Sequence, residues 1–274
     1  MLGKLLKHEF HATGRIMLPA LAALVLLAGM ANLSYRGVDY VDNAVLNIIL
    51  NFIIVVFFLG LFAAGIIAVV IMVQRFYKNL LGEEGYLMFT LPVNVHGLVW
   101  SKLIVSTVWI TITWLVCIGL LTMTVFNFAS LGFDELLRSL PSLRETLQAF
   151  YTHTDITPWD MAGYIAELIV YAVLSSFSGC LMFYAAMAIG HCFSKNKVLL
   201  SIVAFIAISF ILQILFASFG VATGSVLDTV DFTNANAVHV MHGVFLYFCL
   251  TSLAQAAILY LLTVIPLKKG LNLA

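Results

Sequence analysis

The chain has 274 residues, of which 63% are hydrophobic and only 9% are charged, and its formal net charge is zero. Soluble domains carry about 25% charged residues and about 45–50% apolar ones, so this composition requires lipid as the solvent. It contains no basic tail or basic face of the kind that nucleic acid requires, which excludes nucleic acid as a partner.

The first segment, residues 1–15, is amphipathic on a helical wheel. Its apolar face holds Leu2, Leu5, Leu6 and Phe10, and its basic face holds Lys4, Lys7, His8, His11 and Arg15. This pattern predicts an amphipathic helix lying in the cytoplasmic interface, ahead of the first span. Glu9 falls on the apolar face, where it needs a polar partner or a contact with another protein.

The remaining residues, 16–274, contain six apolar segments that reach the length of about 20 helical residues that a bilayer needs. They are residues 16–33, 44–73, 98–126, 161–190, 198–221 and 243–265. Backbone groups in lipid must find partners within the segment, and the alternation typical of a barrel is absent, so we predict an all-α membrane protein.

Lysine and arginine set the expected orientation. With the N-terminus in the cytoplasm, ten basic residues lie inside, and Arg36, Arg138 and Arg144 lie outside. The positive-inside rule favours this arrangement, which puts both termini in the cytoplasm, residues 74–97 inside, and residues 127–160 and 222–242 outside. A cleaved signal peptide is the alternative for the first span, because Gly29-Met30-Ala31 resembles a cleavage site.

The chain shows little sign of catalytic chemistry. It has no GxxxxGK[ST] phosphate loop, and the HxxH of His239 and His242 lacks a third metal ligand. We therefore expect no enzyme activity, no bound cofactor and no metal site in this chain. The cysteines have no metal-ligand spacing, so we interpret them as small core residues without disulfides: Cys117, Cys180, Cys192 and Cys249.

The segment 74–97 carries more features than a connection needs. We expect Gln74–Leu81 to continue as a helix and Gly82 to end it in a left-handed cap. Glu83 and Glu84 follow, and the apolar run 86–89 comes next. Aromatic residues and Met are enriched in the cores of protein interfaces, so the segment predicts a docking surface, and an apolar side lying on lipid is the alternative.

The run GEEGYLMFTLPV, preceded by RFYKNL and followed by WSK, resembles the type-2 ABC transporter permeases of Gram-positive bacterial exporters. One departure is Asn94, where that family often has a small hydroxyl residue. The resemblance implies a six-span subunit of the bacterial cell membrane, with short re-entrant helices in residues 222–242. It also implies an interface that docks on an ATPase, formed by Arg75, Lys78, Glu83, Glu84, Gly85, Tyr86, Phe89 and Glu9.

The expected function is therefore that of an exporter permease. ATP and Mg would bind to a separate ABC ATPase, and a second permease, either a copy or a relative, would complete the pathway. The resemblance favours an antimicrobial peptide, a drug or a lipid as substrate. Alternatives are a non-transporting sensor or scaffold, and an ion-coupled transporter or channel whose polar path uses Glu167, Asn47 and Asn51. Local pairing or hydration is the alternative for Glu167.

Overall fold

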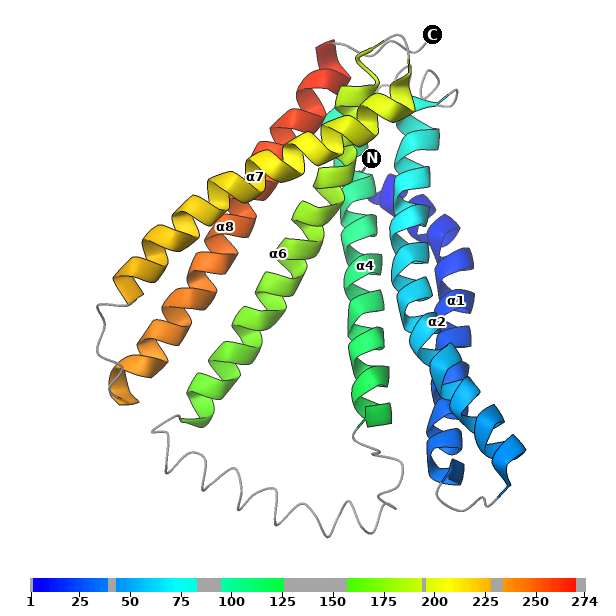
Figure 1. Ribbon diagram of the computed structural model, residues 1–274. Helices are drawn as coiled ribbons and strands as arrows, with labels where there is room; N and C mark the ends of the chain where they lie inside the picture. The colour runs from blue at the N-terminus through cyan, green and yellow to red at the C-terminus, as the bar shows by residue number, and fades with distance from the viewer. Residues whose placement is uncertain are drawn as a thin grey trace. The chain divides into compact units, whose positions relative to one another are not determined.

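The computed structural model describes residues 2–38, 43–82, 95–125, 157–193, 196–227 and 234–269. None of these residues lies in a β-strand. They form α1 (Leu2–Val38), α2 (Ala44–Phe76), η1 (Tyr77–Leu81), α4 (Val95–Val125), α6 (Pro158–Gly190), α7 (Lys197–Leu227) and α8 (Asn234–Lys269) (Figure 1). Six helices are long and apolar enough to cross a membrane, which confirms the all-α fold with six candidate spans.

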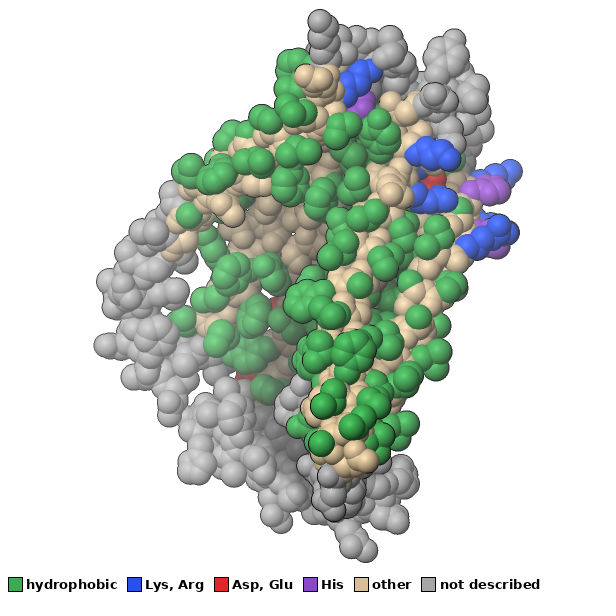
Figure 2. Space-filling model, turned by 45° about the vertical axis from the view of Figure 1, so that its right-hand side comes forward, with side chains coloured by type: hydrophobic (Ala, Val, Ile, Leu, Met, Phe, Trp, Pro, Cys, Tyr) green, Lys and Arg blue, Asp and Glu red, His purple; other side chains and the backbone are tan. Residues whose placement is uncertain are grey.

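Large apolar side chains are exposed along these helices. Phe62 is 74% exposed, Leu26 is 71% exposed and Ile214 is 70% exposed. Figure 2 shows hydrophobic side chains over much of the described surface that faces the viewer. A soluble monomer rarely exposes a contiguous apolar patch of more than a few hundred Å², so this surface fits a lipid environment.

The helix contacts divide the chain into two units. Unit 1 comprises Met1–Leu6, Met72–Thr107 and Leu147–Ala274, and unit 2 comprises Lys7–Ile71 and Val108–Thr146. In unit 1, α6 packs against both α7 and α8, which contact each other much less. A cavity with several polar side chains in its lining lies beside α6, between α7 and α8.

The core of unit 2 is built where small residues let helices approach. Phe57 of α2 is fully buried against Ala28 and Ala31 of α1. A Cβ added to Gly60 would lie 3.3 Å from a methyl carbon of Leu27, which shows how near the two helices come. Close packing of this kind is the main attraction between helices in lipid, because lipid tails are as apolar as the side chains.

The N-terminal segment differs from its expectation as a helix of its own. Residues 2–15 and the first span form one helix, α1, which has no break at residue 15. This part of α1 also contacts α4: Thr13 is 1% exposed, and its Oγ1 accepts a hydrogen bond of 2.8 Å from the indole N–H of Trp109. This part of α1 is therefore held against another helix.

Two segment ends also differ from expectation. Gly82 does end the helix, but it is extended, with φ −89° and ψ −167°, so the left-handed cap was wrong. The last turn is π-helical, and the Gly82 N–H reaches the carbonyl of Tyr77 at 2.8 Å without a positive φ. In residues 222–242, α7 extends to Leu227 and α8 begins at Asn234, so both ends of this segment are helical.

Candidate functional site

The predicted docking surface is described only in part. Glu83, Glu84, Gly85, Tyr86 and Phe89 lie outside the described residues. Arg75 is half-buried at the end of α2 and Lys78 is exposed in η1, while Glu9 lies in α1 in unit 2. What the structure does show is how the chain is held on both sides of residues 83–94, and both of these anchors belong to unit 1.

The first anchor holds the chain just before the docking segment. Phe76 is fully buried and stacks on Tyr184 of α6, with ring centroids 3.9 Å apart and planes 11° apart. The Tyr184 hydroxyl lies 2.5 Å from the hydroxyl of Ser106 in α4. Leu80 and Leu81 of η1 are also buried. The end of α2 is therefore fixed to α6, and through Tyr184 to α4.

His191, directly after α6, supports the same anchor. It is 2% exposed, and its Nδ1 lies 2.8 Å from the carbonyl of Met187. A carbonyl can only accept, so Nδ1 carries the proton. Burial lowers the pKa of His191, and the charge of Lys197 acts in the same direction. The neutral ring packs edge-on against Tyr77 of η1, with centroids 5.3 Å apart.

The second anchor holds the chain just after the docking segment. In the first turn of α4, His96 Nε2 lies 2.8 Å from Nζ of Lys268, and His96 Nδ1 lies 2.7 Å from the hydroxyl of Tyr260. An ammonium group can only donate, so Nε2 accepts and Nδ1–H donates to the tyrosine oxygen. Trp100 packs on the Tyr260 ring at 5.7 Å. These contacts fix the start of α4 to α8.

The intramembrane acid Glu167 is paired locally. Its Oε1 lies 2.8 Å from Nδ1 of His242, which joins α6 to α8. Tyr164 stacks on the His242 ring with centroids 4.4 Å apart. The Oε2 of Glu167 is buried and has no hydrogen-bond partner among the described residues. Glu167 was interpreted either as part of a polar path or as locally paired or hydrated, and the structure shows a local pair with His242.

The other two predicted path residues lie in α2, in unit 2. The Asn51 amide donates a hydrogen bond of 2.8 Å to the backbone carbonyl of Asn47, one turn earlier in the same helix. This bond is local to α2, and Glu167 belongs to unit 1.

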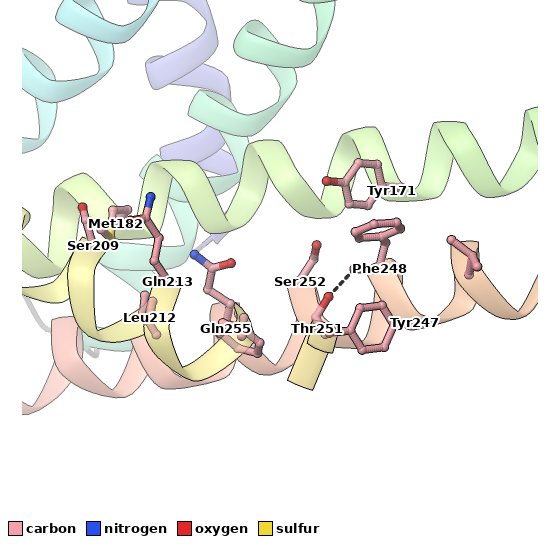
Figure 3. A pocket seen from close by; sticks show the side chains of 13 residues that line it. Tyr171, Met182, Ser209, Leu212, Gln213, Tyr247, Phe248, Thr251, Ser252 and Gln255 are labelled. Atoms are coloured by element: carbon pink, nitrogen blue, oxygen red, sulfur yellow. Dashed lines mark hydrogen bonds between the residues drawn. The ribbon is translucent and has the colours of Figure 1, made fainter. Parts of the chain in front are cut away.

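Sequence analysis missed a polar cavity of about 550 Å³ between α6, α7 and α8. Its lining includes the carboxamides of Gln213 and Gln255, and Figure 3 shows both side chains extending from α7 and α8 toward α6. Neither glutamine is among the predicted path residues Glu167, Asn47 and Asn51. The signal was a glutamine inside each of two otherwise apolar spans.

The cysteines are all free thiols, but only Cys180 is fully buried, and Cys192 is exposed because it lies beyond the last turn of α6. The described part of the chain contains no group of three His, Cys, Asp or Glu side chains placed to hold a metal. No protein-family model, curated protein or solved structure matches this chain.

Proposed function

We propose that this chain is the permease subunit of an ATP-binding-cassette exporter with a type-2 permease fold. It would lie in the bacterial cell membrane with both termini in the cytoplasm, and pair with a second permease. A separate ATPase subunit would bind ATP and Mg, so that this chain contributes transport and no catalysis. Six candidate spans and the resemblance of residues 75–102 to the permease docking loop support this proposal.

The observation that carries the proposal is the pair of anchors around residues 83–94. Any force applied to this segment reaches α6 through the Phe76–Tyr184 stack, and reaches α8 through the His96–Lys268 contact. A simple connection between two spans needs neither contact. An arrangement in which both ends are tied to other helices suits a segment that transmits motion from a partner into the membrane.

The first test is a pull-down of the tagged chain from its native membrane, followed by an ATPase assay. We expect an ABC ATPase to co-purify with the wild type. The variant Glu84→Arg reverses a charge in the docking segment and should lose the ATPase or its stimulation. Glu145→Arg, the same change in the predicted outer segment, is the matched control. Recovery of the chain without ATP hydrolysis would exclude the permease function.

A second test addresses transmission apart from docking. Lys268→Met removes the cation that donates to His96 and keeps a similar side-chain volume. The ATPase should still co-purify, but ATP hydrolysis should respond less to transported substrate. Lys269→Met is the matched control one residue further along. Equal coupling in both variants would show that this anchor transmits nothing.

The Glu167–His242 pair favours a second candidate function, an ion-coupled transporter. A carboxylate and an imidazole that share a hydrogen bond inside a membrane can exchange a proton, and intramembrane ionisable residues are functional candidates by default. Liposomes containing this chain alone, without ATP, would then take up protons when a pH gradient is imposed, and Glu167→Gln would abolish the uptake. Absence of proton uptake in the wild type would exclude this function.

A further inference from the structure

The cavity between α6, α7 and α8 combines apolar walls with polar groups in the middle of two spans. Gln213 lies midway along α7, and Gln255 lies near the middle of α8. The volume of about 550 Å³ falls in the range of about 300–1,000 Å³ that small-molecule sites occupy. It is also far larger than the roughly 30 Å³ that one water takes up in the liquid.

Two hydroxyls and two carboxamides of the cavity lining differ in how they are bonded. The Ser209 hydroxyl donates to the carbonyl of Phe205 at 2.7 Å, and the Thr251 hydroxyl donates to the carbonyl of Phe248 at 3.0 Å. These hydroxyls use their hydrogens on their own helices and keep their lone pairs. The carboxamide of Gln213 is exposed and that of Gln255 is half-buried, and neither makes a hydrogen bond within the described part of the chain. Each offers two N–H donors and one carbonyl acceptor.

The lining of the cavity also sets the charge of what it accepts. The described residues that line it include no Asp, Glu, Lys, Arg or His, so a charged group held by these walls would find no counter-charge among them. The rings of Tyr171, Phe216, Tyr247 and Phe248 supply an apolar wall. This lining suits a ligand with a neutral group that donates and accepts hydrogen bonds, facing the glutamines, and an apolar body, facing the aromatic rings.

The Glu167–His242 bridge lies beside one end of this cavity. Glu167 precedes the lining residue Tyr171 by one helical turn, and His242 precedes the lining residue Val244 by two residues. The bridge therefore holds α6 and α8 together next to the position where the cavity ends along both helices. The bridge fixes the spacing between α6 and α8, which line the cavity on the sides that α7 does not.

We propose that this cavity is a binding site for a neutral amphiphile whose head group carries an amide. The carboxamides of Gln213 and Gln255 bind the head group, and the aromatic wall holds its apolar body. Two amides pair through complementary N–H and carbonyl groups, which satisfies polar groups that are otherwise without partners in a membrane. The site needs no ATPase, and its test uses this chain alone.

The test uses the full chain in lipid nanodiscs and a diazirine derivative of oleamide as photoreactive probe. After illumination, mass spectrometry should locate adducts on peptides from the cavity walls of α7 and α8, and unlabelled oleamide should compete. Methyl oleate has the same chain length but no N–H donor, and should compete about tenfold less well, as expected for the loss of one or two hydrogen bonds of about 1 kcal/mol each.

The variant Gln213→Met/Gln255→Met keeps the side-chain volumes and removes the carboxamides. It should weaken oleamide competition by about tenfold or more, whereas Gln74→Met, the same change in α2, should leave it unchanged. If the double variant does not fold, the two single variants and the competition on wild type decide the matter. Adducts spread evenly over lipid-facing positions, or equal competition by oleamide and methyl oleate, would overturn the proposal.

Discussion

The hydrogen bond between α1 and α4 gives a sharp prediction about stability in unit 2. Thr13→Val keeps the shape of a side chain that is 1% exposed, but removes the acceptor of the Trp109 indole N–H, whose side chain is 7% exposed. A buried donor left without a partner costs about 1–3 kcal/mol. Bonds between membrane helices average about 0.6 kcal/mol and reach about 1.7 kcal/mol. We therefore expect a loss of about 1–2 kcal/mol.

The measurement is reversible unfolding in mixed detergent micelles, followed by far-ultraviolet circular dichroism. Thr13→Ser is the control: it keeps the hydroxyl, loses one methyl group, and should cost no more than about 0.8 kcal/mol. The same Thr13→Val change is then made in a Trp109→Phe background, which has no indole N–H to strand. There it should cost close to nothing, so the cycle gives a coupling energy of about 1–2 kcal/mol.

Two results would refute this reasoning. If Thr13→Val costs the same in both backgrounds, the hydrogen bond contributes nothing and the effect belongs to packing alone. If Thr13→Ser costs more than Thr13→Val, the methyl group matters more than the hydroxyl.

Two further predictions concern unit 1. Burial lowers the pKa of His191 below 6.5, so the folded state binds a proton less readily than the unfolded state does. The stability that depends on a neutral His191 is therefore present above pH 6.5 and is lost as the pH falls through the folded-state pKa. We expect His191→Gln to make the unfolding midpoint fall less steeply on acidification. Gly190→Ala would place a Cβ 2.6 Å from the backbone nitrogen of Ser201, so it should lower the free energy of unfolding in micelles by about 1–3 kcal/mol. The control is Gly179→Ala on the same helix, where nothing lies within 4 Å of an added Cβ. That change should be neutral or stabilising.

The spans could be predicted from the sequence because lipid imposes a simple rule. A bilayer needs about 20 apolar residues in a helix, and each span shows such a run. The predicted segment 161–190 lies within α6 (Pro158–Gly190), and 44–73 lies within α2 (Ala44–Phe76). Helix ends were harder, because a polar residue beyond the apolar run does not stop a helix by itself. The continuation of α1 through residue 15 is the clearest case.

Contacts between distant parts of the chain could not be predicted in this way. Glu167 and His242 are separated by 75 residues, and nothing in either helix indicates which of its faces meets the other. The same holds for His96 and Lys268, which are 172 residues apart. In apolar spans the hydrophobic pattern is nearly uniform around the helix, so it carries little information about neighbours. The isolated polar residues of the spans show which helix faces meet, but only after the structure shows which of them pair.

The π-helical turn at the end of α2 has a consequence for the direction in which the chain leaves that helix. Its hydrogen bonds span five residues instead of four, so the turn holds one residue more than the α-helical pattern would. The Gly82 N–H bonds the carbonyl of Tyr77, so Gly82 lies above Tyr77, where an α-helical turn would place Leu81. If the same five residues were α-helical, Gly82 would leave the helix about 100° further around its axis. The π-helical turn therefore determines the face of α2 from which the chain leaves the helix.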